Sequence, residues 1–300
     1  MPSANCGRQF LFAAHKALSL QHYHRSHALV CWKPARKIPH CTVHYGLWHD
    51  AIFGKGRRVT RIISLHSFTE GAGRTTLAAN IAALMAQRGQ QVALLCARTD
   101  DPTLRHLFTL RKDVPSLNDY IQGSVPIREI VQEVTAQIGL ARGRLHVVEL
   151  GVPSGAPPSL NVLSSAIDTL SELLHLDVVL IENPAGLARS ALTLIALADL
   201  LTIVLLLDQE HYNGVSVLLD VAERLGVPLV RLIVNQVSSE FTQTEVKVRV
   251  EETYQQTVAV VVPYSPDLNG RDGLIVVQNS SHVFSAACSV AASALLEVNI

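Results

Sequence analysis

The sequence predicts an α/β fold, a doubly wound and mostly parallel β-sheet with helices on both faces. Short, continuously apolar runs such as Gln91–Cys96 are typical of strands that are buried on both sides. Helical patterns alternate with these runs, which favours crossover connections between parallel strands. A glycine-containing turn at 71–73 joins the first run to the first helix. Ligands of such folds bind at the carboxyl ends of the strands, so we expect the functional site there.

The individual elements follow from hydrophobic periodicity and from breaker residues. We expect strands at 62–65, 91–96, 145–150, 177–182, 200–207, 230–234 and 258–262. The first helix carries an apolar face of Leu77, Ile81, Leu84 and Met85, and further helical segments are expected at 103–108, 117–122, 127–134, 160–174, 191–198, 215–225, 244–254 and 281–298. Asp199 interrupts the apolar stretch 191–207, so this stretch is divided into a helix and a strand and is not expected to span a membrane.

Residues 1–58 differ from the rest of the chain and are expected to be an atypical extension of a single domain at 59–300. They contain nine Lys and Arg against one acidic residue, and seven of the thirteen histidines. A His/Cys metal site is disfavoured because the ligand spacing is not paired. A basic targeting peptide and a translation start near Val59 remain alternatives, and we favour the start at Val59, which begins a strand-first domain in a bacterial sequence. The five unpaired cysteines fit a reducing cytosol.

The stretch 61–76 predicts a phosphate-binding loop. A strand, a glycine turn and a helix in this order aim backbone N–H groups and a helix N-terminus at an anion. Gly73-Arg74-Thr75 resembles the end of a Walker A loop, in which a cation contacts the phosphates and a hydroxyl binds the metal.

Residues 59–298 resemble the MinD/ParA family of deviant Walker A P-loop ATPases. Four segments carry the resemblance, in the family's order and spacing: the loop 69–76 (TEGAGRTT), the strand 92–96 with its continuation, the segment 181–186 (IENPAG) over Walker B, and the strand end Val234-Asn235. The resemblance implies ATP and Mg²⁺ as ligands, a homodimer that encloses nucleotide, and slow hydrolysis that drives a positional switch.

Carried over residue by residue, the resemblance assigns specific roles. Nucleotide binding falls to Gly71, Ala72, Gly73, Arg74, Thr75, Thr76 and, for the base, Asn235. Metal binding falls to Thr75 and Glu182, and the degenerate catalytic positions are Glu182 and Arg98.

Several of these positions depart from the family pattern. Arg74, Thr69 and Glu70 replace two lysines and a glycine of the loop, while Cys96 and Arg98 replace an Asp-x-Asp pair and Glu182 replaces an aspartate. A carboxylate about 5 Å from a phosphate costs roughly 3 kcal/mol at an effective dielectric near 20. We therefore expect weakened ATP binding and poor Mg²⁺ binding, and we hypothesise that Arg98 and Glu182 pair in the resting state.

Three functions follow as alternatives: an ATP-responsive dimeric switch with weak or absent hydrolysis, an active ATPase that positions cargo, and a nucleotide-free scaffold that binds a protein partner. The net charge is zero, and Lys247 and Arg249 are too few to indicate nucleic-acid binding. The last helix lacks Lys and Arg, so no basic amphipathic membrane tail is expected. The segment 208–212 is either a ligand-facing loop or a helix start capped by Asp208, and we favour the cap.

Overall fold

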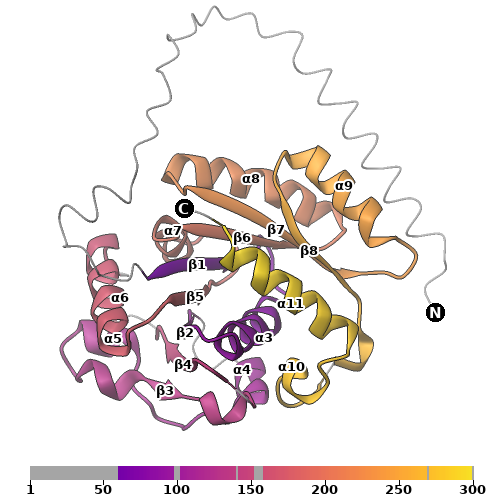
Figure 1. Cartoon of the computed structure of the whole chain (residues 1–300). Coiled ribbons are helices and arrows are strands. Elements are labelled where there is room, and N and C mark those ends of the chain that lie inside the picture. Colours follow the sequence, from indigo (N-terminus) through magenta and orange to yellow (C-terminus); the bar gives the residue numbers. More distant parts are fainter. Residues whose placement is uncertain (1–59, 98–101, 140, 152–157, 269, 299–300) are drawn as a thin grey trace, which may run out of the picture. The chain divides into compact units, whose positions relative to one another are not determined.

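A computed structural model describes residues 60–97, 102–139, 141–151, 158–268 and 270–298. The predicted extension at 1–58 and the predicted site residue Arg98 lie outside these ranges. The described part is built around one eight-stranded sheet (Figure 1). The predicted fold class is therefore confirmed.

The strand order of the sheet is β3-β4-β2-β5-β1-β6-β7-β8, which places β1 at the centre. Neighbouring strands are parallel except for β3, which pairs antiparallel with β4. The strands are β1 (Arg61–His66), β2 (Gln91–Cys96), β3 (Gln132–Glu133), β4 (Arg144–Glu149), β5 (Val178–Glu182), β6 (Leu200–Leu205), β7 (Leu229–Val237) and β8 (Val258–Pro263).

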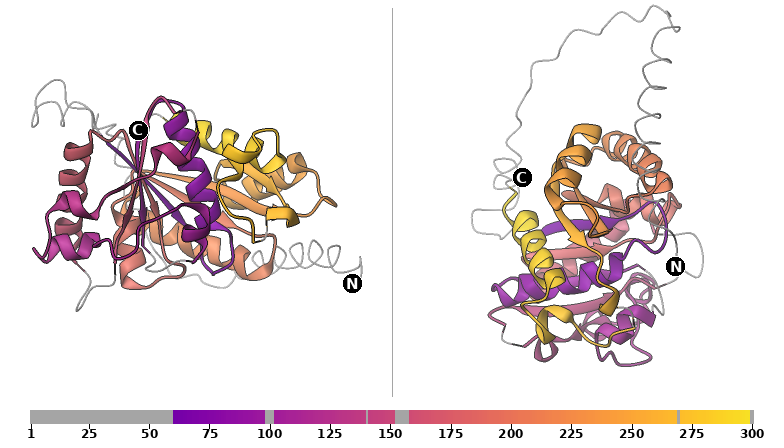
Figure 2. Two further views of the ribbon diagram at one scale, coloured as in Figure 1. Left: turned by 90° about the horizontal axis from the view of Figure 1, so that it is seen from below. Right: turned by 90° about the vertical axis from the view of Figure 1, so that its right-hand side faces the viewer.

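Helices cover both faces of this sheet (Figure 2). The helices are α3 (Arg74–Gln87), α4 (Pro102–Leu107), α5 (Leu117–Ile121), α6 (Leu160–Leu174), α7 (Arg189–Ala196), α8 (Gln209–Leu225), α9 (Gln243–Tyr254), α10 (Ile275–Gln278) and α11 (Val283–Leu296), with 3₁₀ turns η1 (Ile127–Ile130), η2 (Thr135–Gln137) and η3 (Pro266–Leu268). One core unites α3, α4, α10 and α11 with the sheet, while two others lie under α8 and α9 and under α5 and α6.

Helix α3 packs against the sheet and beside α11, and its composition explains this position. Its buried residues include five alanines, Ala78, Ala79, Ala82, Ala83 and Ala86. Small side chains on several sides of a helix allow close approach of neighbouring layers without leaving voids. The helix that begins at the glycine turn thus packs closely against the sheet and its neighbouring helices.

Most predicted elements are confirmed within a few residues, but the segment 127–134 was predicted wrongly as a helix. It forms the turn η1 and then β3, whose Gln132 and Glu133 pair with Val147 and His146 of β4. Pairing with the edge of β4 decides the conformation of residues 132–133, and the local sequence pattern contains no information about this pairing.

Two other boundaries differ from the prediction, and both matter for the site. Helix α8 begins at Gln209 instead of 215, because the Asp208 side chain accepts a hydrogen bond from the His211 amide at 2.9 Å. This confirms that Asp208 is a helix cap. Strand β7 continues to Val237, so Asn235 lies within the strand and not after it. Among the described helices, none is both long and apolar enough to span a membrane.

Candidate functional site

The loop between β1 and α3 is shaped by two glycines with left-handed backbone conformations. Gly71 has φ 79° and Gly73 has φ 81°. A Cβ atom at Gly73 would lie 2.5 Å from Nδ2 of Asn235, so only glycine fits there without displacing a neighbour. Gly73 is the N-cap of α3, and no described side chain caps the helix there. The first backbone N–H groups of α3 are therefore available to an anion.

Two amides from β7 hold this loop from one side. Nδ2 of Asn235 donates to the carbonyl of Ala72 at 2.8 Å, and Nε2 of Gln236 donates to the carbonyl of Gly71 at 3.1 Å. Gln236 has φ 56° at an irregularity of the β7–β8 pairing, a conformation that directs consecutive side chains toward the same loop. Asn235, predicted to read a base, thus braces the loop backbone in this structure, and its contact with a base stays a prediction.

Arg74 is buried and its guanidinium connects two loops. Nη1 donates to the carbonyl of Asn183 at 2.9 Å, and Nη2 donates to the Glu70 carboxylate at 3.2 Å. The Glu70 side chain is 63% exposed. The sequence predicted that the Glu70 carboxylate lies within the anion site. In the structure it lies at the surface and pairs with Arg74, so water screens its repulsion of an anion.

Thr75 and Glu182 form the second polar contact of the site. The Thr75 hydroxyl donates to Oε1 of Glu182 at 2.9 Å, and the carboxylate is buried. A hydroxyl that donates in this way keeps its oxygen lone pairs for a cation. One hydroxyl and one carboxylate beside a phosphate suit Mg²⁺, which takes one or two carboxylates together with substrate phosphates. The pair predicted to bind a metal is thus brought together.

The carboxyl ends of three neighbouring strands carry the remaining polar groups of this edge. Cys96 of β2 lies in register with Glu182 of β5 on one side and with Glu149 of β4 on the other. The sequence comparison assigned a role to the Cys96 position and missed Glu149. Among the described residues, no group of three or more His, Cys, Asp and Glu is arranged to hold a metal ion.

His66 lies beneath the loop at the end of β1 and is fully buried. Burial, and after it the nearby charge of Arg74, lower its pKa to about 4, against the opposing effect of the Gly186 and Pro184 backbone. The ring is therefore neutral near pH 7. A neutral imidazole here leaves Arg74 as the cation at the loop.

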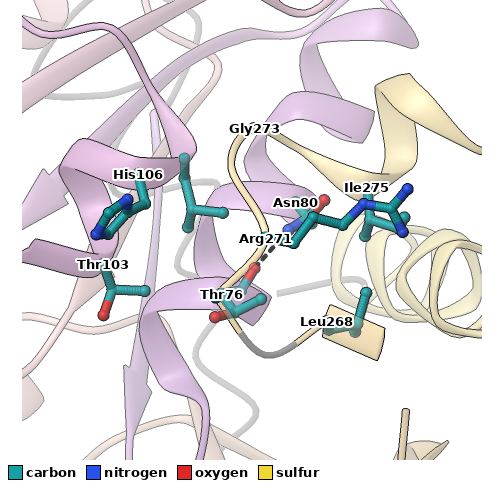
Figure 3. A pocket seen from close by; sticks show the side chains of 10 residues that line it. Thr76, Asn80, Thr103, His106, Leu268, Arg271, Gly273 and Ile275 are labelled. Carbon is teal, nitrogen blue, oxygen red and sulfur yellow. Dashed lines mark hydrogen bonds between the residues drawn. The ribbon is translucent and has the colours of Figure 1, made fainter. Parts of the chain in front are cut away.

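A cavity of about 260 Å³ opens on the other side of the first turns of α3 (Figure 3). Thr76 and Asn80 line it, and Asn80 is held by bonds to the Thr76 carbonyl at 2.8 Å and from the Val276 amide at 3.2 Å. Its other lining residues come from α4 and from the segment after β8: Thr103, His106, Leu107, Leu268, Gly270, Arg271, Gly273 and Ile275. The sequence did not reveal this cavity, because its walls come from three separate segments.

The structure thus gathers most of the predicted site at one place. The loop 71–75 is contacted by Glu182 through Thr75 and by Asn235 through Ala72, and Thr76 faces the adjoining cavity. Asn183, Gln236 and Asn80 were missed. Each contributes through a position fixed by distant elements.

Comparison with known proteins agrees with this geometry. Residues 63–273 match the model of the CobQ/CobB/MinD/ParA nucleotide binding domain. An uncharacterized ATP-binding protein of Methanocaldococcus jannaschii is 29% identical over 211 residues, covering 68% of this chain and 74% of the relative. The MinD cell division protein of Aquifex aeolicus superposes with a TM-score of 0.67 at 20% identity, covering 80% of this chain and 98% of that one.

A further solved structure, MinD of Pyrococcus horikoshii complexed with Mg-ADP, has a TM-score of 0.63 at 18% identity, covering 80% of this chain and 97% of that one. At these identities the structures establish the fold alone, whereas the family match spans most of the chain. The chain belongs to the CobQ/CobB/MinD/ParA nucleotide-binding domain family.

Proposed function

We propose that this protein is an ATP-responsive switch that binds adenine nucleotide on the loop 71–76 and hydrolyses it slowly or not at all. The observation that carries the proposal is the Gly73 turn, which exposes the N-terminus of α3 beside the Thr75–Glu182 pair. An anion is stabilised there by backbone N–H groups and by the helix dipole. The relative from Methanocaldococcus, named as ATP-binding, and the Mg-ADP complex of a MinD support the ligand class.

In this proposal, different residues bind the phosphates, the metal ion and the nucleoside. The backbone of Gly71, Ala72 and Gly73 and the first turn of α3 hold the phosphates. Thr75 and Glu182 hold Mg²⁺, which neutralises phosphate charge when bound. The cavity beside Thr76 receives part of the nucleoside. Its volume of 260 Å³ is slightly less than the usual range of about 300–1,000 Å³ for whole small-molecule sites, so it has room for part of a ligand.

Slow hydrolysis follows from the groups that surround Glu182. Phosphoryl transfer depends on positioning the attacking water and compensating charge. The register position next to Glu182 on β2 is occupied by the buried Cys96, so this position offers no carboxylate to hold a water molecule or a metal ion. We propose that nucleotide acts as a conformational signal, read by a second copy of this chain or by a protein partner.

The alternative of an active ATPase is favoured by one observation, the intact hydroxyl–carboxylate contact of Thr75 and Glu182. Thermal unfolding with ATP, ADP and Mg²⁺ separates the possibilities, because a ligand at 100 times its Kd stabilises the native state by about 2.7 kcal/mol. Nucleotide stabilisation with slow or no turnover supports the switch, metal-dependent stabilisation with efficient turnover supports the ATPase, and no shift rejects both in favour of a scaffold.

A matched pair of variants assigns the shift to this site. Thr75→Val removes the hydroxyl at the loop and is expected to abolish any metal-dependent component. Thr169→Val is the control, because this partly exposed threonine lies on α6, away from the loop, and its hydroxyl donates to the Ser165 carbonyl of its own helix. Equal shifts in both variants would place nucleotide elsewhere.

A further inference from the structure

The tip of the phosphate-binding loop is connected to the start of α8 by a chain of side-chain contacts that the proposed nucleotide chemistry does not use. Oγ1 of Thr69 lies 2.8 Å from Nε2 of His211, and Nδ1 of the same ring lies 2.8 Å from Oδ2 of Asp208. The His211 side chain is only 5% exposed. Thr69 occupies the position of the family's signature lysine.

The Asp208 carboxylate orients the imidazole of His211. A carboxylate oxygen accepts hydrogen bonds, so Nδ1 of His211 donates to Asp208, and Nε2 is thereby directed at the Thr69 hydroxyl. The hydroxyl at the tip of the loop is thus held by a side chain of α8.

A second contact joins the same two segments. A Cβ atom at Gly214 would lie 2.2 Å from Cγ of Phe68, so the absence of a side chain on α8 makes the space that Phe68 occupies. Phe68 packs against the core under α8 and α9. Adjacent loop residues are thus attached to one turn of α8, one by a hydrogen bond and the other by packing.

We propose that His211, oriented by Asp208, is a positioning residue that fixes the phosphate-binding loop through Thr69, in place of the charged contact that a lysine would make. The inference rests on the proposed nucleotide site. The cap geometry at Asp208 accounts for its bond to the His211 backbone, but it does not require the imidazole to reach Thr69. The contact with the loop is a separate feature that this chain has in addition to an ordinary helix cap.

A double-mutant cycle tests the proposal. Thr69→Val removes the hydroxyl with its shape kept, and His211→Phe removes both ring nitrogens while the Asp208 cap on the backbone stays. If Thr69 acts through His211, each single variant lowers ADP affinity by about tenfold and the double variant by no more than either alone. Additive losses would show that Thr69 contacts the phosphate directly and would overturn the proposal.

Hydrogen exchange of the amides in 67–73, measured without nucleotide, separates this proposal from the nucleotide-binding proposal. Faster exchange in both variants supports the positioning role of His211. If the wild-type protein fails to bind ADP, that result contradicts the proposed function but leaves the positioning role standing. Unchanged exchange in both variants overturns the positioning role. Thr69→Ser, which keeps the hydroxyl, should restore wild-type exchange, and the exposed Glu210→Gln serves as the control on the same turn of α8.

Discussion

The two sides of the first turns of α3 differ in how they are filled. On the loop side, the protein's own side chains occupy the polar positions, with Arg74 bonded to Asn183 and Glu70, Thr75 to Glu182 and Asn235 to Ala72. On the side of Thr76 and Asn80, a cavity of about 260 Å³ remains. Both sides belong to one helix that packs rigidly against the sheet.

Because of this difference, the phosphates and the nucleoside of a nucleotide would meet different resistance on binding. A nucleoside would enter existing space, whereas phosphates would compete with internal hydrogen bonds. Each internal hydrogen bond contributes about 0.5–1.5 kcal/mol net to stability, and somewhat more when one group is charged. Breaking these bonds would therefore lower the affinity for phosphate only modestly.

The largest effect is expected at the loop glycines. Gly73→Ala places a methyl group against Asn235 and also strains φ 81°, so we expect a loss of about 3 kcal/mol in the free energy of unfolding. Gly71→Ala is the matched control, because its φ is 79° but nothing lies within 4 Å of the added atom, and about 1 kcal/mol is expected. Urea denaturation at an unchanged m-value measures both.

The clash itself is tested by adding Asn235→Ala to Gly73→Ala. Relief of part of the loss in the double variant is expected, since the obstructing amide is then gone. If Gly73→Ala costs no more than Gly71→Ala, the close packing of β7 against the loop is not the cause.

The pH dependence of stability is expected to report on His66. Its pKa falls from 6.5 to about 4 on folding, so the unfolded chain binds more protons between these values. Stability is therefore full above pH 6.5 and declines by about 3 kcal/mol as the pH falls toward 4. Denaturant titrations at several pH values measure this slope.

His66→Leu should flatten the pH dependence in that window and leave stability at pH 7 within about 1 kcal/mol, because the ring it replaces is neutral and buried. Burial also lowers the pKa of His146, which gives a smaller slope of the same sign in the variant. A slope that is the same in the wild type and in His66→Leu would contradict the assignment.

An intermediate effect is expected when the cavity is filled. Leu268→Trp adds volume at its wall, so ADP affinity should fall by about tenfold while binding of inorganic tripolyphosphate stays unchanged. Isothermal calorimetry with the two ligands gives the comparison. Leu160→Trp, at an exposed position at the start of α6, is the control. Equal losses for both ligands would mean that the cavity does not receive the nucleoside.

The smallest effect is expected at Glu70. Glu70→Gln removes a negative charge near the loop and weakens its hold on Arg74, both of which favour an anion. Because the side chain is 63% exposed, the gain should be only about 0.2–1 kcal/mol of binding free energy and should shrink at high salt. ADP affinities at two ionic strengths measure it. Weaker binding by the variant would show that Glu70 supports the site.

Secondary structure was predictable wherever the signal was local. The uniformly apolar run 91–96 forms the buried strand β2, and Asp208 caps a helix, as the local patterns predict. The segment 127–134 failed because its two-residue strand depends on the edge of β4. The loop glycines and the Thr75–Glu182 pair were anticipated from the resemblance to the MinD/ParA family, while the proposed pairing of Arg98 with Glu182 involves a residue outside the described ranges.

The alternation of buried strands and helices, and the glycine turn that exposes a helix N-terminus, follow from residues close together in the chain and were therefore predictable. The contacts of the loop's polar side chains depend instead on how distant segments fold together. Arg74 reaches Asn183 over 109 positions, Thr69 reaches His211 over 142 and Ala72 meets Asn235 over 163. Contacts at such separations depend on the order of strands in the sheet, and no local pattern of residues encodes that order.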